Sequence, residues 1–137
     1  VILMVTMKGC YKMTDYTVKD FGSFTEIAKL ENGKTFLHDA LDLTSCEISI
    51  NSTPKGFKVP FSHKHKQNEE IYIVLKGNGI ITIGENRINI KEGSAVRVAA
   101  GVARTIENTG DSEFNFICIQ AKENSLAQFG FGDAELC

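Results

Sequence analysis

Two histidines separated by one residue are the side chains of this sequence best suited to chemistry. They are His63 and His65, within segment 61–66, Phe-Ser-His-Lys-His-Lys. Side chains alternate between two faces of an extended strand, so Phe61 and both histidines share one face and the lysines share the other. Glu70 follows five positions after the second histidine. Two imidazoles and a carboxylate are a donor set for one divalent metal ion, so these three residues are the candidate ligands.

Two further side chains are candidates to contact a substrate beside these ligands. Tyr72 shares the face of Glu70 in the apolar run 70–75, although a place in the hydrophobic core is the simpler assignment for a tyrosine in such a run. Gln67 lies in the loop between the candidate ligands and could reach the same pocket. A lone histidine, His38, precedes an aspartate and is expected to be a structural or surface residue.

The apolar run 70–75 is also informative about what surrounds it. Both of its faces are apolar beyond Glu70, and a strand with two apolar faces is covered on both of them. One cover is the interior of a barrel. The other could be an N-terminal strand or a second subunit, and we therefore expect a homodimer.

Short strand-like runs separated by turns rich in glycine and asparagine fill the chain from Phe21 onward. The expected strands are 25–30, 35–37, 43–50, 57–65, 70–75, 80–83, 87–90, 95–98, 102–106 and 114–119. We find no convincing amphipathic helix, and we expect the tail 125–137 to form a short helix or a strap over the barrel. Many short strands at this spacing are typical of an all-β sandwich or barrel.

Length and composition are those of one globular domain. The chain has 137 residues, of which 42% are hydrophobic and 23% charged, and this is enough to bury a core. The net charge of −2 gives no electrostatic reason to bind nucleic acid or an anionic membrane, so we expect neither as a partner.

The cysteines and the N-terminus add two expectations. The chain has four cysteines, Cys10, Cys46, Cys118 and Cys137. They lie far apart in the sequence and form no Cys-x-x-Cys pair. This pattern argues against a zinc ribbon or a thioredoxin-type motif and favours a reducing compartment, so we expect a cytoplasmic protein. Residues 1–7 are apolar but too few to span a membrane. We treat residues 1–12 as an N-terminal segment of uncertain status and 13–137 as a single domain.

The region around the two histidines resembles the first sequence motif of the cupin superfamily. That motif has a glycine, five residues, His-x-His, three or four residues, a glutamate, six residues and a glycine. Here Gly56 is followed by six residues, then His63 and His65, four residues, Glu70, six residues and Gly77. The spacing differs only between the glycine and the first histidine, where this chain has six residues instead of five.

A second cupin motif lies further along the chain with its spacing intact. The family pattern is a glycine, five residues, Pro-x-Gly, two residues, a histidine, three residues and an asparagine. Here the corresponding positions are Gly93, Ala99, Gly101, Arg104 and Asn108. An alanine in place of the proline matters little, whereas an arginine in place of the histidine changes the chemistry of the site.

The resemblance implies a small single-domain metal-binding cupin with a double-stranded β-helix, also called a jelly-roll barrel. In metal-binding cupins the ligands are the two histidines and the glutamate of the first motif and the histidine of the second. Carried over, this implies that His63, His65 and Glu70 bind one divalent ion (Zn, Mn, Fe or Ni), with Arg104 where the fourth ligand would be.

Alternation places Arg104 on the same face as Val102 and Ile106, and therefore inside the barrel. A guanidinium is always charged, so a buried one needs an anionic partner. That partner could be Glu70, with or without a metal ion, or an anionic substrate. The remaining alternative is that Arg104 points outward into solvent.

The favoured function is a small metal-binding cupin whose reaction the sequence does not specify. Its substrate is expected to be a small anionic or sugar-like molecule, and the chemistry to be of the isomerase or oxygenase type. The alternative is a non-catalytic module that binds a small molecule beside a degenerate metal site. Whether the protein is an enzyme stays open at this point.

Overall fold

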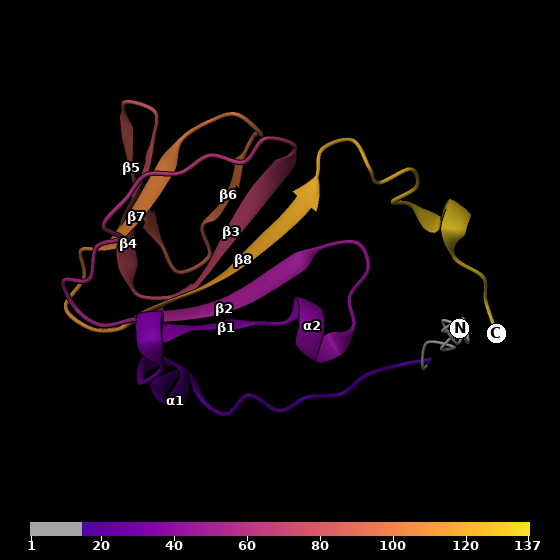
Figure 1. Cartoon of the computed structure of the whole chain (residues 1–137), viewed down its shortest axis with the longest axis horizontal. Coiled ribbons are helices and arrows are strands. Elements are labelled where there is room, and N and C mark those ends of the chain that lie inside the picture. The colour runs from indigo at the N-terminus through magenta and orange to yellow at the C-terminus, as the bar shows by residue number, and fades with distance from the viewer. Residues whose placement is uncertain (1–14) are drawn as a thin grey trace, which may run out of the picture.

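Two antiparallel β-sheets face each other in the structure, a computed structural model that describes residues 15–137 (Figure 1). One sheet has five strands in the order β1-β2-β8-β3-β6, and the other has three in the order β5-β4-β7. The strands are β1 Lys34–Phe36, β2 Glu47–Thr53, β3 Asn68–Lys76, β4 Asn78–Ile83, β5 Asn86–Lys91, β6 Ala95–Val98, β7 Arg104–Asn108 and β8 Phe114–Lys122.

The order of the strands is that of a double-stranded β-helix. The last strand, β8, lies between β2 and β3 and pairs antiparallel with both, so distant parts of the sequence meet in one sheet. The predicted all-β jelly-roll barrel is therefore confirmed. Among the described residues, no helix is long and apolar enough to cross a membrane.

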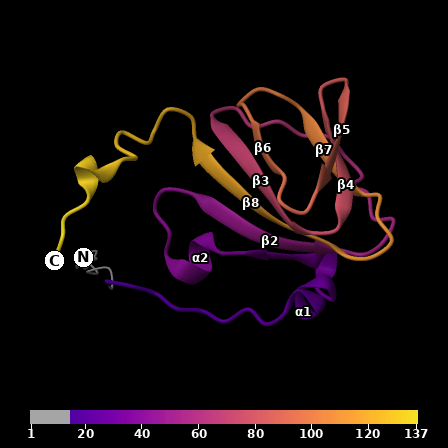
Figure 2. The same cartoon turned by 180° about the vertical axis from the view of Figure 1, so that it is seen from behind.

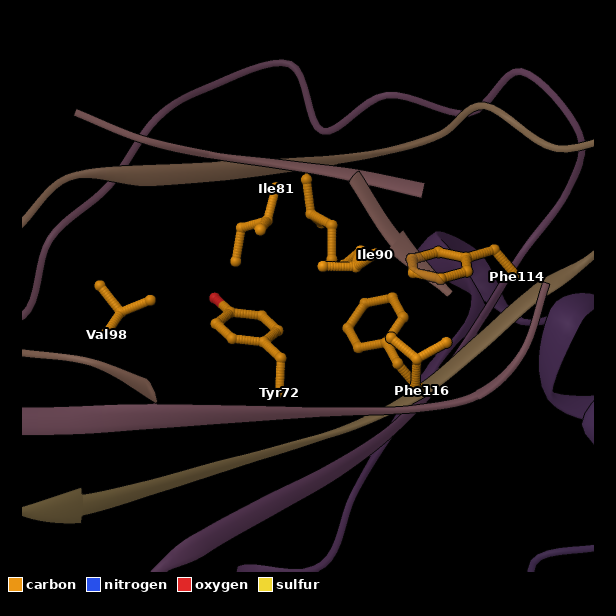
Figure 3. Packing of buried hydrophobic residues seen from close by; sticks show 8 residues of the cluster. Tyr72, Ile81, Ile90, Val98, Phe114 and Phe116 are labelled. Carbon is orange, nitrogen blue, oxygen red and sulfur yellow. The ribbon is translucent and has the colours of Figure 1, made fainter. Parts of the chain in front are cut away.

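The hydrophobic core fills the space between the two sheets (Figure 3). Phe114 and Phe116 on β8 pack with their ring centroids 5.2 Å apart, and Ile81 on β4 is fully buried across from Tyr72. The buried cluster comprises Tyr72, Val74, Ile81, Ile90, Val98, Ile106, Phe114 and Phe116. Each of these side chains removes apolar surface from water, which is the main favourable contribution to folding.

The predicted alternation in β3 is confirmed. Glu70, Tyr72 and Val74 are buried on the inner face, while Ile71 and Ile73 on the outer face are half-buried. A single strand thus supplies both a core residue and the carboxylate of the candidate metal site.

Gly77 ends β3 and carries the chain from one sheet to the other. Its φ of 89° lies in the region that side chains disfavour, and a β-carbon there would approach the carbonyl oxygen of Glu113 to 2.5 Å. The final glycine of the first motif is therefore required by the close approach of two backbone segments.

Two short helices lie in the part of the chain where the sequence showed no convincing amphipathic helix. Residues 25–30 were expected to form a strand, but α1 (Phe24–Ala28) begins after the N-cap Ser23, whose hydroxyl accepts a hydrogen bond from the backbone of Glu26. Ile27 of this helix is buried, and the helix packs on β2. A second helix, α2 (His38–Leu41), ends at Asp42 with φ of 54°. Helices this short show little periodicity, although the Ser-x-x-Glu spacing is a known helix-start signal.

Segment 57–65 is not the regular strand that the sequence predicts. It makes only two isolated bridges, from Lys58 to Glu107 and from His63 to Arg104. Conversely, residues 51–53 were expected to form a turn but continue β2, where they are buried and pair with β8. In both cases pairing with a distant strand decides the local structure.

The C-terminal tail does not form the strap that was one of its two expected structures. It contains a 3-10 helix, η2 (Phe131–Asp133), and stands away from the barrel (Figures 1 and 2). Its large side chains are exposed, including Leu126, Phe129 and Phe131. A second 3-10 helix, η1 (Glu31–Gly33), precedes β1. The N-terminal segment 1–12 and Cys10 lie outside the described residues.

Candidate metal centre

Backbone hydrogen bonds bring segment 63–65 against β7. His63 and Arg104 exchange two of them, with N–O distances of 3.1 and 2.9 Å, and the amide of Gly101 donates to the carbonyl of His65 at 2.7 Å. These bonds place both histidine side chains opposite the inner face of β3, where Glu70 lies.

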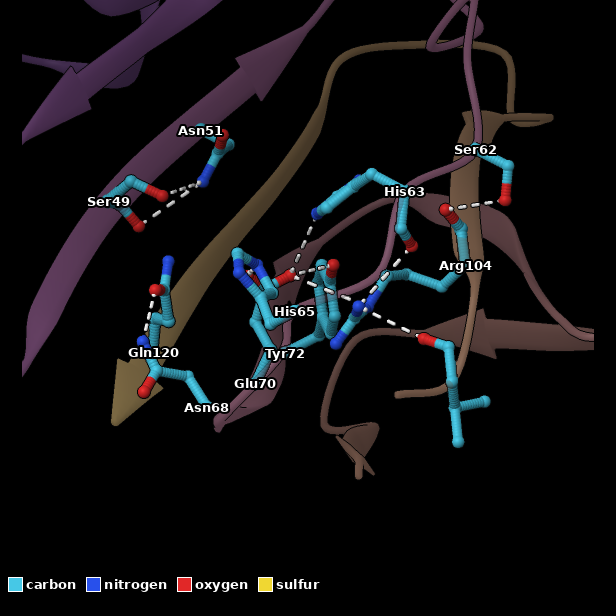
Figure 4. Close-up of polar contacts among 11 residues, drawn as sticks. Ser49, Asn51, Ser62, His63, His65, Asn68, Glu70, Tyr72, Arg104 and Gln120 are labelled. Atoms are coloured by element: carbon cyan, nitrogen blue, oxygen red, sulfur yellow. Dashed lines mark hydrogen bonds and ion pairs between the residues drawn. The ribbon is translucent and has the colours of Figure 1, made fainter. Parts of the chain in front are cut away.

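The three candidate ligands converge on one point (Figure 4). One donor atom from each of His63, His65 and Glu70 lies within 4.8 Å of the other two. Nε2 of His65 lies 2.8 Å from Oε2 of Glu70, and Nε2 of His63 lies 3.9 Å from Oε1. Metal–ligand bonds of about 2.0–2.2 Å would fit these separations with small movements.

Of the three candidate ligands, His63 makes the fewest polar contacts with the described residues. Its ring makes no side-chain hydrogen bond to the described residues, and its Nδ1 is buried without a partner. The ring of His65 lies at right angles to it, with the centroids 5.1 Å apart. Nε2 of His63, the nitrogen that faces Glu70, also makes no hydrogen bond within residues 15–137 and can offer its lone pair to a divalent ion, so the donor set fits the group that the motif implies.

For two of the candidate ligands, His63 and Glu70, the direction of the pKa shift favours the charge state that metal binding requires. Burial lowers the pKa of His63, and this favours the neutral ring. Burial alone would raise the pKa of Glu70, but a hydrogen bond from the hydroxyl of Tyr72 and the charge of Arg104 outweigh it, so the pKa is lowered. Burial also raises the pKa of Tyr72, which therefore remains a hydrogen-bond donor.

Arg104 lies inside the barrel beside Glu70, as alternation predicts, and only 1% of its surface is exposed. Its Nε lies 3.8 Å from Oε1 of Glu70, too far for a hydrogen bond, while Nη1 donates to the carbonyls of His63 and Val102 at 3.4 and 3.1 Å. Nε and Nη2 are buried without a hydrogen-bond partner in the described part of the chain. The ion pair with Glu70 thus leaves part of the guanidinium's hydrogen-bonding capacity unused.

A cavity of about 480 Å³ opens beside these residues. Tyr72 and Arg104 contribute to its wall, and Phe36 and Phe61 line it with largely exposed rings. This volume is within the range of small-molecule sites. The cavity and the candidate ligands form one continuous site.

Two residues considered from the sequence lie elsewhere. Gln67 is exposed and is not among the residues that line the cavity; its carbonyl accepts a hydrogen bond from the amide of Glu123. His38 pairs with Asp39 at 2.8 Å on the surface, as expected for a residue outside the site.

Other lining residues were not anticipated. Cys118 is half-buried, packs against the core cluster and also contributes to the cavity wall. Burial raises the pKa of its thiol, which favours the protonated form. Ser49 and Asn51 on β2 also line the cavity. The alternation of polar residues with Ile48 and Ile50 was a signal for them, which the assignment of a turn at 51–54 obscured.

The comparison with protein families agrees with this fold and site. The family model described as "Cupin domain" matches residues 51–120, a span that includes both motifs. The chain therefore belongs to the cupin family.

Proteins with a solved structure or a curated description are similar to this chain to different extents. A cupin protein from Bacteroides fragilis has a crystal structure that is 38% identical, with a TM-score of 0.80; the match covers 91% of this chain and 99% of that one. The oxalate-binding protein of Thermotoga maritima is 33% identical over 66 residues, 48% of this chain and 54% of the relative.

One more curated protein and one more solved structure are also similar to this chain. An uncharacterized protein of Methanocaldococcus jannaschii is 32% identical over 65 residues, 47% of this chain and 51% of the relative. The chain therefore spans about half the length of the curated relatives that it matches. A crystal structure described as a predicted oxalate decarboxylase from Thermotoga maritima is 29% identical, with a TM-score of 0.53, over 55% of this chain and 64% of that one.

Proposed function

We propose that this protein binds a small carboxylate anion at a divalent metal ion held by His63, His65 and Glu70. The observation that carries the proposal is the convergence of these three donors beside Arg104, a buried cation with unpartnered N–H groups. A carboxylate can accept hydrogen bonds from a guanidinium, and such charge-assisted bonds are among the strongest in proteins.

Each residue of the site has a separate task in this proposal. The histidines and Glu70 hold the ion, and Tyr72 orients Glu70 by donating a hydrogen bond to Oε1. Arg104 neutralises and orients the anion. A bound ion of this kind (Zn, Mn, Fe or Ni) supplies Lewis-acid or redox chemistry, which would suit an isomerase or an oxygenase.

A second candidate is a binding module without catalysis. It is supported by Arg104 itself, which stands where the second motif has a fourth metal ligand, and by the relative in Thermotoga maritima that is named an oxalate-binding protein. Incubation of the metal-loaded protein with oxalate and other small acids separates the two: product formation supports the enzyme, and stable binding without product supports the module.

The metal site is tested by measuring metal stoichiometry on protein prepared without a histidine tag. We expect about one ion per chain for the parent protein and its loss in His63→Ala and His65→Ala, because each variant leaves two ligands. His38→Ala is the matched control, since this third histidine lies outside the site and should leave the stoichiometry unchanged. Full occupancy in either site variant would contradict the assignment.

The anion site is tested by calorimetric titration of oxalate into the metal-loaded and the metal-free protein. Binding that requires the metal is the expected result. Oxalate binding of equal strength in both forms, or none in either, would contradict the proposal.

We also propose that the protein forms a homodimer through the outer face of the five-stranded sheet. Ile71 and Ile73 on β3 lie on this face and are only half-buried by the described residues of one chain. Light scattering after size-exclusion chromatography should give twice the mass of the chain, and Ile73→Lys should shift it toward the monomer. A monomeric parent protein would contradict this.

A further inference from the structure

Beside the metal site, the wall of the cavity that β8 and β2 form is polar, which is unusual for the inner face of a barrel strand. Ser49 and Asn51 on β2 point inward and are only 4% and 2% exposed. On the next strand, Gln120 lines the same cavity. Figure 4 shows all three on the sheet beside the metal-binding residues. Buried polar groups are unfavourable unless they are hydrogen-bonded, so their available hydrogen-bonding capacity indicates what they can bind.

Part of that capacity is already used within the protein. The amide nitrogen of Asn51 donates to the carbonyl and hydroxyl oxygens of Ser49 at 3.2 and 3.1 Å and to the carbonyl of Phe116 at 3.4 Å. The amide oxygen of Gln120 accepts a hydrogen bond from Asn68 at 2.6 Å. These bonds fix the orientation of the side chains.

The remaining capacity belongs to side chains that line the cavity. Among the described residues, nothing donates to Oδ1 of Asn51, nothing accepts from Nε2 of Gln120, and the hydroxyl of Ser49 acts only as an acceptor. Both Asn51 and Gln120 line the cavity. The wall therefore offers two donors and one acceptor, a mixture that hydroxyl groups can satisfy because each both donates and accepts.

The strand register places this wall at a defined distance from the metal site. Ser49 is paired with Cys118, which is paired with Tyr72, so Ser49 and Tyr72 are separated by two strand spacings. Two spacings correspond to roughly 10 Å between backbones. Inward side chains of neighbouring strands in one sheet run roughly parallel, so a ligand that contacts both the metal site and Ser49 has to span most of this distance, and a chain of about six carbons with its terminal oxygens does so. A two-carbon acid such as oxalate is too short to reach both ends.

We propose that the pocket selects a hydroxylated carboxylic acid of about six carbons. This inference rests on the proposed function, because its carboxylate end lies at the metal ion and Arg104. Its hydroxyl groups contact Ser49, Asn51 and Gln120, which determine specificity. An unsubstituted alkyl chain in the same place would cover these polar groups without satisfying them, and sites of this kind discriminate strongly against the analogue that lacks the hydroxyl.

The test compares three acids by calorimetric titration into the metal-loaded protein. D-Gluconate has six carbons and several hydroxyls, hexanoate has the same length without hydroxyls, and oxalate reports the carboxylate end alone. We expect gluconate to bind at least about tenfold more tightly than hexanoate, since several hydrogen bonds separate them. The His63→Ala variant, measured in parallel, reports any binding that does not involve the metal site.

Two serine variants on the same strand localise the effect. Ser49→Ala should weaken gluconate binding roughly three- to tenfold, as for the loss of one hydrogen bond, and leave hexanoate and oxalate unchanged. Ser52→Ala is the control: Ser52 is equally buried, but its hydroxyl bonds to Asn115 and does not line the cavity. The ratio of its affinities for gluconate and hexanoate should equal that of the parent protein, even if the variant is less stable.

The outcomes separate this inference from the proposed function. Equal affinities for gluconate and hexanoate would overturn the inference, and so would a ratio of these two affinities that Ser49→Ala leaves unchanged. In either case, metal-dependent binding of oxalate would still support the proposed function. Failure of the metal-loaded protein to bind any of the three acids overturns both.

Discussion

The two ends of β3 differ in what their inward side chains do. At one end Val74 packs against Phe114 and Phe116 in the closed core; at the other, Glu70 contacts the histidines and Arg104 in an open cavity. Tyr72 lies between them and belongs to both, since its ring packs with Phe116 and its hydroxyl donates to Glu70. The alternation of the strand is the same throughout, so only the residue types separate the part that stabilises the barrel from the part that lines the cavity.

The largest effect on stability should come from the closed end. Phe114 is 1% exposed, and Phe114→Ala should lower the free energy of unfolding by about 3–5 kcal/mol through lost burial and a cavity. Chemical denaturation measures this change. The metal stoichiometry of the folded fraction should stay the same, and its loss would show that the two ends are not separable.

Arg104→Met should act at the open end instead. It removes the charge-assisted hydrogen bonds proposed for the anion, worth about 1.5–3 kcal/mol, so oxalate affinity should fall at least about tenfold while the metal is retained. Titration with oxalate measures this effect. Unchanged affinity would place the anion away from Arg104.

Arg104→His restores the residue type of the second motif at a position beside Glu70, one of the three candidate ligands. A fourth ligand should tighten metal binding, by roughly tenfold, or about 1.4 kcal/mol. Competition with a chelator of known affinity measures the change. An affinity equal to that of the parent protein would mean that position 104 does not reach the ion.

The smallest effect should come from a helix remote from both ends. Ser23→Ala removes the N-cap of α1 and should cost about 0.5–1 kcal/mol of stability. Because α1 packs on β2 without lining the cavity, metal and oxalate binding should not change. A change in either would reveal coupling between the helix and the site.

Much of the site could be predicted because it depends on local alternation. The inward positions of His63, His65 and Glu70 follow from the period of two, and so does that of Arg104. Where the chain departs from a regular strand, as in segment 57–65, the two histidines still face the site because backbone bonds to residues 101 and 104 hold them there.

The features that could not be predicted depend on contacts between distant segments. Whether residues 51–53 form a turn or a strand is decided by pairing with β8, more than sixty residues away in the cases of Ser52 and Thr53. Gln120 enters the cavity wall for the same reason, because β8 lies between β2 and β3. Short-range patterns contain no information about such pairing.

Crystallography with anomalous scattering at the absorption edge of a loaded transition metal tests the central claim most directly. The account predicts one strong peak per chain, within bonding distance of Nε2 of His63, Nε2 of His65 and a carboxylate oxygen of Glu70. A peak at another place, or none after loading with zinc, manganese, iron and nickel in turn, would contradict it.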